Sequence, residues 1–359
     1  MPTKIATYGI LLAIFASFIP VSSSLAESKA PPTAALIGGT YVDAHPLPIA
    51  IVAGLKSYCS GLLVGPRVVL TAAHCLDDDT PAEQYQVAVG GSLHAVSAVQ
   101  MHPSYEPNSP VSLSKSRFDI GLVTLGSAVL TVKPTPILLN HPLKLNDVIS
   151  VQAFGSNEKP DSAFKTIYEE AKSADLKVEE LYDGLIATSF SGSNAAMCSG
   201  DSGGPVTMKI GNVTVSVGTV SLGSTQLLDD GTCINANDGI SAYVDLQSSY
   251  VQNFLEGNSG ILFAPQKLIT FSNEAEKITT EIKKVLSSKT KRDLVVSISR
   301  VRTEIRNLNK LADAKRLAKT KSALSLAVSI PKQKTLKAGI AQVKKLNGII
   351  KALAALGAV

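Results

Sequence analysis

Tryptophan is absent from the 359 residues of this sequence, and aromatic residues make up only 5% of them. Few side chains are therefore available to stack on nucleic-acid bases, and no nucleic-acid-binding motif is present. Cysteine is scarce as well: the four cysteines include no C-x-x-C pair and have no companion set of histidines. Because zinc sites are built from such pairs, the sequence predicts no metal site, and we expect no cofactor.

Long apolar runs are also lacking, except near the start. Lys4 is followed by an apolar stretch from Tyr8 to Pro20 and by the small-x-small sequence Ser24-Leu25-Ala26. This order is typical of a secretory signal peptide, whereas a membrane span needs roughly 20 apolar residues. We therefore expect residues 1–26 to direct secretion to the extracellular space, and we expect no transmembrane span.

Acidic residues are few in the last part of the chain. Residues 257–359 contain 21 Lys and Arg against 6 Asp and Glu, a net charge of +15. The formal charge of the whole chain is only +5, so residues 1–256 carry −10. An asymmetry of this size indicates two parts with different surfaces.

The acidic part has the composition of an all-β protein. Short runs of β-branched residues are separated by Gly, Pro, Asn and Asp, which favours short strands in a sandwich or a barrel. Four of these predicted strands cover residues 49–52, 68–70, 120–123 and 213–217.

From about Gly257 the apolar residues follow a helical period instead. Spacings of three and four predict one helix around 278–286, another around 294–308 and, after an interruption at Pro331, a third over 336–353. Asn273, with Glu276 three residues on, is interpreted as a helix start. Residues 257–359 are therefore expected to form a basic extension of about three amphipathic helices.

Ser202 lies in a stretch, Met197–Val206, that is rich in glycine and contains a carboxylate. A serine hydroxyl is a poor nucleophile without a base, and this stretch has no histidine. Gly200 and Gly203 permit a tight turn, in which the amides of Gly200 and Ser202 can point at one developing oxyanion. Taken alone, the G-D-S-G sequence fits an ordinary turn about equally well.

A base and an orienting acid are available elsewhere in the chain. His74 follows an apolar run and precedes Cys75, and histidine has the pKa best suited to proton transfer near neutral pH. Asp119 stands among apolar residues, as expected of a buried acid that fixes a histidine tautomer. Singly, they are more typical of a packed histidine and a strand-end aspartate. Together with Ser202 they are no longer independent.

The sequences T-A-A-H-C, D-I-x-L and G-D-S-G-G-P around these residues resemble those of the trypsin- and chymotrypsin-like serine peptidases, from about Leu36 to Leu255. The resemblance implies two six-stranded antiparallel β-barrels over residues 36–256 and a secreted serine endopeptidase that works through an acyl-enzyme. It implies Ser202 as nucleophile, His74 as general base, Asp119 as orienting acid, and the Gly200 and Ser202 amides as oxyanion hole. These roles are those of the family's own template.

Four cysteines in an exported protein predict two disulfides, with three pairings open. The resemblance selects Cys59–Cys75 beside the histidine and Cys198–Cys233 across the specificity pocket.

The same resemblance implies activation by a cut between Ala35 and Leu36. Residues 27–35 would be a propeptide, the uncut chain a zymogen, and the new amine at Leu36 a partner for Asp201. Ala35 replaces the usual Arg or Lys, so a tryptic activator is not expected.

The resemblance implies a specificity pocket with Ala196 at its floor and Gly223 and Gly239 as walls. Ser221, Leu222 and Gly223 would pair with the substrate backbone as an added strand. An open, uncharged pocket favours large apolar side chains. Asp238 would place a carboxylate there if the alignment shifted by one residue.

Two questions stay open at this level. The alternative to an active endopeptidase is a non-catalytic secreted binding or inhibitor protein on the same scaffold. The basic extension fits a solvated or packing bundle, a module for docking on the acidic domain, or one that binds an anionic surface or polyanion through lysine-rich helices.

Overall fold

The computed structural model describes residues 36–44, 46–54, 58–77, 79–107, 112–155, 170–210, 213–223, 226–227, 233–234, 239–312 and 314–354. The predicted signal peptide, residues 1–26, and the predicted propeptide, residues 27–35, lie outside these residues.

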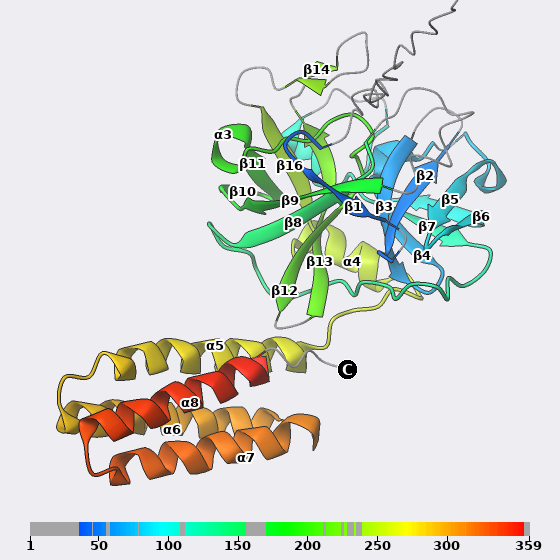
Figure 1. Ribbon diagram of the computed structural model, residues 1–359. Coiled ribbons are helices and arrows are strands. Elements are labelled where there is room, and N and C mark those ends of the chain that lie inside the picture. The colour runs from blue at the N-terminus through cyan, green and yellow to red at the C-terminus, as the bar shows by residue number, and fades with distance from the viewer. Residues whose placement is uncertain are drawn as a thin grey trace, which may run out of the picture. The chain divides into compact units, whose positions relative to one another are not determined.

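The first half of the β region closes into a barrel of six antiparallel strands in the order β2-β3-β4-β7-β6-β5 (Figure 1). The strands are β2 (Ile49–Ala53), β3 (Tyr58–Gly65), β4 (Val68–Thr71), β5 (Gln86–Val89), β6 (Ser92–Met101) and β7 (Gly121–Leu125). Small and β-branched apolar side chains fill the barrel, among them Val52, Val69 and Val123. The first of the two predicted barrels is therefore confirmed.

The second half is an eight-stranded antiparallel sheet in the order β1-β9-β8-β12-β13-β16-β11-β10. The strands are β1 (Thr40–Asp43), β8 (Val148–Ala153), β9 (Glu170–Lys177), β10 (Glu180–Tyr182), β11 (Leu185–Ser189), β12 (Pro205–Ile210), β13 (Val213–Gly223) and β16 (Ile240–Asp245). We expected a second closed six-stranded barrel. In the described residues the short strands β1 and β10 extend the two edges of the sheet, and no pairing between them closes it.

Short elements connect and flank these strands. They are η1 (Ala73–Cys75), η2 (Ala82–Gln84), α1 (Leu113–Ser116), α3 (Phe190–Ser193), β14 (Gln226–Leu227), β15 (Cys233–Ile234) and α4 (Ser249–Glu256). One apolar cluster joins the barrel to the sheet, since Leu70 and Leu122 pack with Val244 and with Leu255 of α4. This packing brings the end of β4 and the start of β7 close to the sheet, where the candidate site lies.

Residues 261–264 belong with the strands, although we expected the helical extension to begin at Gly257. Leu262 donates to the Val64 carbonyl and accepts from Ile137, both at 2.8 Å, and Ala264 donates to Ile137 at 2.8 Å. Ile261 is buried in the cluster that joins the barrel to the sheet. The strand-like contacts therefore continue to Ala264.

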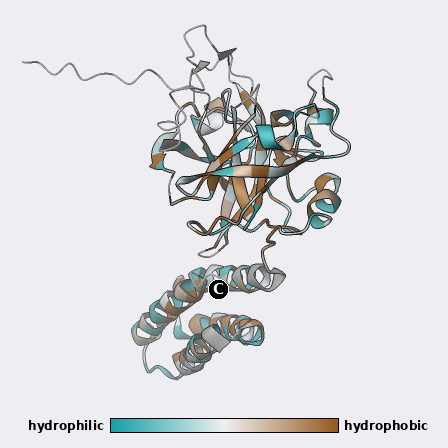
Figure 2. Ribbon diagram, turned by 90° about the vertical axis from the view of Figure 1, so that its right-hand side faces the viewer, coloured by the Kyte–Doolittle hydropathy of each residue, from teal (hydrophilic) through white to brown (hydrophobic). Residues whose placement is uncertain are grey.

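The extension itself is a four-helix bundle. Its helices are α5 (Gln266–Leu286), α6 (Lys291–Leu311), α7 (Ala314–Ser329) and α8 (Leu336–Ala354), with η3 (Ile330–Lys332) between the last two. Each helix contacts the next, and α8 contacts α5. The predicted apolar faces form the core, and the helices carry both brown and teal segments in Figure 2.

Two sequence expectations for this region are wrong. There are four helices instead of about three, because α7 fills its core positions with small residues such as Ala323 and Ala327, which give a weak apolar signal. Asn273 is not a helix start: α5 begins at Gln266, after Pro265. Within the part of the chain that the structure covers, no helix combines the length and the hydropathy that a bilayer crossing requires.

Candidate active site

His74 is held by a rigid backbone. It lies in η1, directly after the fully buried strand β4, and the Cys59–Cys75 disulfide ties η1 to β3 with a Cα–Cα distance of 6.0 Å. Ala72 and Ala73 on its N-terminal side are buried. The imidazole nevertheless remains 35% exposed, so its ring can reach solvent from a fixed position.

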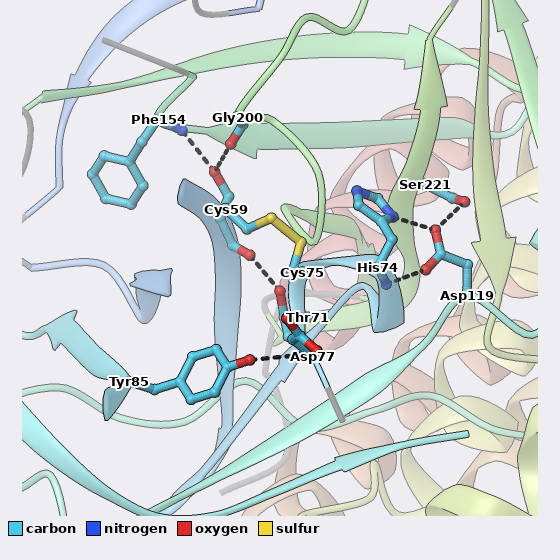
Figure 3. Close-up of a disulfide and its surroundings, with 11 residues drawn as sticks. Cys59, Thr71, His74, Cys75, Asp77, Tyr85, Asp119, Phe154, Gly200 and Ser221 are labelled. Atoms are coloured by element: carbon cyan, nitrogen blue, oxygen red, sulfur yellow. Dashed lines mark hydrogen bonds and ion pairs between the residues drawn. A yellow bond between two sulfur atoms is a disulfide. The ribbon is translucent and has the colours of Figure 1, made fainter. Parts of the chain in front are cut away.

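Asp119, just before β7, receives three hydrogen bonds (Figure 3). The His74 amide donates to Oδ1 at 2.9 Å, His74 Nδ1 donates to Oδ2 at 2.7 Å, and Ser221 Oγ donates to Oδ2 at 2.6 Å. With the proton on Nδ1, Nε2 is an acceptor. The carboxylate is only 3% exposed, so water does not compete for these bonds.

The electrostatics of this pair favour a protonated imidazole. Burial lowers the pKa of His74, but the hydrogen bond and the negative charge of Asp119 outweigh it, so the pKa is raised above 6.5. Neutral His74 therefore offers Nε2 as an acceptor, and the imidazolium that forms when Nε2 takes a proton is stabilised by Asp119.

Ser221 has a contact that its sequence position did not predict. We assigned residues 221–223 to backbone pairing with substrate, but the Ser221 hydroxyl lies on Asp119. Leu222 and Gly223 pair with β16 on one side, whereas the pairing of β13 with β12 ends at Thr219. In the described residues the other edge of β13 is unpaired here, as backbone pairing would require.

The loop that carries Ser202 packs on the end of β4. Ser60 in β3 donates its amide to the Ser202 carbonyl at 2.8 Å. Gly203 has φ +78°, and a Cβ there would collide with Thr71 Oγ1 and the Ser60 carbonyl. Because Thr71 is three residues before His74, the loop places Ser202 beside the segment that carries the histidine. Among the described contacts, no hydrogen bond joins the side chains of Ser202 and His74.

Ser60 is a buried connector that sequence reasoning missed. Its hydroxyl donates to the Gly200 carbonyl at 3.0 Å and accepts from the Phe154 amide at 3.0 Å. Its carbonyl accepts from Thr71 Oγ1 at 2.8 Å. A serine after a cysteine in a strand carries no signal of this role, because its partners come from distant segments.

The amides of the Ser202 loop divide into two groups. Those of Asp201, Gly203 and Gly204 donate to Cys198, Val220 and Asp201 carbonyls. Among the described residues, no acceptor is recorded for the amides of Gly200 and Ser202, and Gly200 adopts φ +83°. These are the two amides that we expected to form an oxyanion hole.

Asp201 is fully buried and faces the start of the described chain. The Cys198 amide donates to Oδ2 at 2.8 Å, and the Leu36 amide donates to Oδ1 at 3.3 Å. Burial raises the pKa of Asp201 to about 7, although these amides and the charge of Lys172 oppose the shift. The two residues of the predicted activation contact are thus in direct contact.

The predicted pocket residues are brought together in part. Ala196 is fully buried and forms a β-bridge with Ile37. The amide of the adjacent Met197 donates a hydrogen bond to Ser241 Oγ at 3.1 Å. A Cβ on Gly223 would lie 2.8 Å from the Met197 carbonyl, so Gly223 lies against the same segment. Gly239 accepts from the Phe190 amide at 3.1 Å, and Asp238 lies outside the described residues.

The family model described as Trypsin matches residues 36–245, which include all of this site. The chain belongs to the trypsin family. The predicted catalytic residues His74, Asp119 and Ser202 all lie within the matched segment.

Individual members of the family are distant relatives of this trypsin-family protein. Trypsin beta of Drosophila erecta is 27% identical over 61% of this chain and 88% of its own. Hypodermin-A of Hypoderma lineatum is 29% identical over 52% of this chain and 77% of its own, and kallikrein-8 of Rattus norvegicus is 30% identical over 45% and 66%. The solved structure of mouse neuropsin covers 60% of this chain and 96% of its own with 22% identity and a TM-score of 0.45.

One of the two predicted disulfides is described in full. Cys59 and Cys75 are bonded as expected. Cys198 is also disulfide-bonded, but the side chain of its predicted partner, Cys233, lies outside the described residues, so that pairing stays a prediction. Cys59, Cys75 and His74 place their ligand atoms within 4.8 Å of one another, yet both sulfurs are in the disulfide and offer no thiolate to a metal.

Proposed function

We propose that this trypsin-family protein is a secreted serine endopeptidase that cleaves peptide bonds through an acyl-enzyme. The observation that carries the proposal is the His74–Asp119 pair. A 2.7 Å hydrogen bond fixes Nδ1 as the protonated nitrogen and leaves Nε2 to accept a proton. Ser202, on a loop packed against the same segment, is the alcohol that supplies it.

In this mechanism Ser202 Oγ attacks the substrate carbonyl while His74 Nε2 removes its proton. The buried carboxylate of Asp119 stabilises the imidazolium, in keeping with the raised pKa of His74. The Gly200 and Ser202 amides donate to the oxyanion, each worth roughly 3–4 kcal/mol of barrier. His74 then protonates the leaving amine, and water repeats the sequence on the acyl-enzyme; these steps are the family's template.

Activation by a cut before Leu36 fits the contact at Asp201. In the uncut chain Leu36 offers a neutral amide to a carboxyl whose pKa burial raises to about 7. A free amine at the same position would bring a positive charge, lower that pKa and keep Asp201 ionised at neutral pH. Removal of residues 1–26 and then 27–35 would precede activity.

Large apolar side chains are the proposed substrates of the specificity pocket. Ala196 places no charge at its floor, and a buried substrate cation without a partner costs several kcal/mol. Peptide-library cleavage should therefore occur after Phe, Tyr, Leu or Met. Cuts mainly after Lys or Arg would show that Asp238 enters the pocket.

The decisive experiment is covalent labelling of the processed protein with a sulfonyl fluoride, followed by peptide mapping. Label on Ser202 and loss of peptide hydrolysis are expected together. Ser202→Ala should reduce turnover by about 10⁶-fold, as removal of a nucleophilic serine does elsewhere. Ser199→Ala, an exposed serine in the same loop, is the matched control.

If the folded protein is labelled on neither serine, and if Ser202→Ala binds peptides as the unchanged protein does, the non-catalytic binding protein would be favoured instead. No observation in the site favours that alternative, since the hydrogen-bonded pair and the buried Asp201 are both intact.

A further inference from the structure

The two halves of the helical bundle differ in charge. Residues 266–312, which include α5 and α6, contain 11 Lys and Arg and 5 Asp and Glu. Residues 314–359, which include α7 and α8, contain 10 Lys and Arg and no acidic residue. The described ion pairs of the bundle, Lys277–Glu274 and Lys284–Glu281, are both on α5. For the exposed lysines of the α7–α8 half, no ion pair lies within the described bundle.

The lysines of this half are exposed. They are Lys319, Lys321, Lys332, Lys334, Lys337, Lys344, Lys345 and Lys351. On α8, Lys337, Lys344 and Lys351 are spaced by seven residues, which places each about 20° around the helix and about 10 Å along it from the next. They form a lysine row on the face opposite the buried Leu346 and Leu353.

The rest of this face limits what it can bind. Arg316, the arginine of α7, is buried against Phe271 and is not part of the row. Exposed lysines offer point charges without the planar fork that reads individual phosphates or bases. No aromatic residue lies in 314–359 to stack on bases. In the described part of α7 and α8 no large apolar side chain is exposed, which argues against insertion into hydrocarbon.

From this juxtaposition we propose that the α7–α8 half of the bundle attaches the protein to an anionic lipid bilayer, with the lysine row of α8 facing the headgroups. Clusters of four to eight basic residues on a helical surface bind acidic lipids by charge alone. Ala341 and Gly348 lie on the same exposed face as the row, so no bulky side chain holds the lysines away from a flat surface. The attachment is independent of Ser202 chemistry.

Cosedimentation of the full chain with vesicles tests the attachment. Vesicles of phosphatidylcholine with about a third phosphatidylserine should bind the protein and vesicles of phosphatidylcholine alone should not, because each lysine near an anionic surface contributes about fivefold in affinity. The triple variant Lys337→Gln/Lys344→Gln/Lys351→Gln should then bind about 100-fold more weakly. Using the Ser202→Ala background keeps the chain intact and separates this result from the proposed peptidase activity.

A matched control removes the same charge from the other half. Lys283→Gln/Lys289→Gln/Lys310→Gln changes three exposed lysines on α5, on α6 and between them. Packed helices lie about 8–10 Å apart, about one screening length at physiological salt, so this variant should retain binding within about fivefold. Equal losses in both variants would overturn the assignment to the lysine row.

The absence of tryptophan from the chain permits a direct test of orientation. A Cβ on Gly348 meets nothing within 4 Å, so Gly348→Trp places a single indole in open space beside the row. Its fluorescence should shift to shorter wavelength with anionic vesicles, whereas that of Val296→Trp, at a 59% exposed site on α6, should not.

Two results would contradict the proposal. A shift at position 296 and none at 348 would place another face on the bilayer. Binding to a sulfated polysaccharide or duplex DNA, without binding to anionic vesicles at low salt, would identify a polyanion as the occupant instead.

Discussion

The β domain and the helical bundle differ most in what they bury. Beneath the surface of the β domain lie two carboxylates, Asp119 and Asp201, and many hydroxyl groups, including those of Ser60 and Ser221. The bundle buries apolar side chains at helical spacing and, among its described polar residues, only Arg316 and Thr320. A buried polar group costs free energy unless it is hydrogen-bonded.

The two regions also differ in how far along the chain their contacts reach. In the β domain several buried polar groups are bonded to residues far along the chain, such as Asp201 to Leu36, 165 residues apart, and those of Ser60, Asp119 and Ser221 lie at the candidate site. In the bundle the contacts are between neighbouring helices, and the surface carries the charge. We therefore expect substitutions in the first region to change chemistry, and those in the second to change stability or attachment.

Asp119→Asn should produce the largest effect on this comparison. It removes the charge that stabilises the imidazolium, and in the family's reference enzyme this change costs about 10⁴-fold in turnover. Activity needs neutral His74, so the wild-type rate should fall as pH decreases through the raised His74 pKa, above 6.5. In the variant that acid limb should move to lower pH. The rate of peptide hydrolysis as a function of pH measures both the fall in turnover and the shift of the acid limb. A fall in turnover of less than tenfold would contradict the role of Asp119.

Ile305→Ala should destabilise only the bundle. Ile305 is fully buried in the core of α6, and such truncations cost about 2–5 kcal/mol. Calorimetry should show the transition of the bundle at lower temperature, while hydrolysis of a short peptide stays unchanged. Ile305→Val, expected to cost about 0.5–1.5 kcal/mol, is the graded control. A parallel fall in activity would mean that the two regions act as one.

Ser221→Ala tests a positioning residue within the β domain. It removes a 2.6 Å hydrogen bond to a buried carboxylate, a bond worth about 1.5–3 kcal/mol, so kcat/KM should fall about 10- to 100-fold. The loss should be mainly in kcat, because the hydroxyl holds Asp119 and not the substrate. Ser221→Thr keeps a hydroxyl and should recover part of the rate. A change confined to KM would support a substrate-binding role instead.

Removal of the bundle should have the smallest effect on chemistry. A chain ending after Pro265 keeps the contacts of residues 261–264 with Val64 and Ile137, and its turnover of short peptides should stay within about twofold, since no predicted catalytic residue is removed. It should lose binding to anionic vesicles. A chain ending at Asn258 loses those contacts and should unfold at a lower temperature. Lost turnover after Pro265 would show that the bundle supports the site.

Much of the site could be predicted because its residues lie in distinctive local sequences. His74, Asp119 and Ser202 stand in three short motifs that together resemble those of the trypsin- and chymotrypsin-like peptidases, and the strands at 49–52, 68–70 and 213–217 follow from β-branched runs bounded by turns. The helical faces of α5, α6 and α8 were likewise visible as periodic apolar residues. The resemblance of the motifs was sufficient for the candidate catalytic residues, and local periodicity was sufficient for the strands and helices.

Other features depended on contacts between distant segments. Ser60 bridges Gly200 and Phe154, Ser221 supports Asp119, and residues 261–264 join the strands, none of which leaves a local signal. The buried apolar positions of α7 include the alanines Ala323 and Ala327, and the sequence does not show that they are buried because alanine is also common on exposed helix faces. The amino-acid sequence by itself determined the class of fold, the candidate catalytic residues and the charge division. Only the tertiary structure decided which hydroxyls hold those residues, how far along the chain the strand-like contacts continue and which lysines of the bundle are exposed, because a hydrogen bond or an exposed side chain depends on what lies opposite in space.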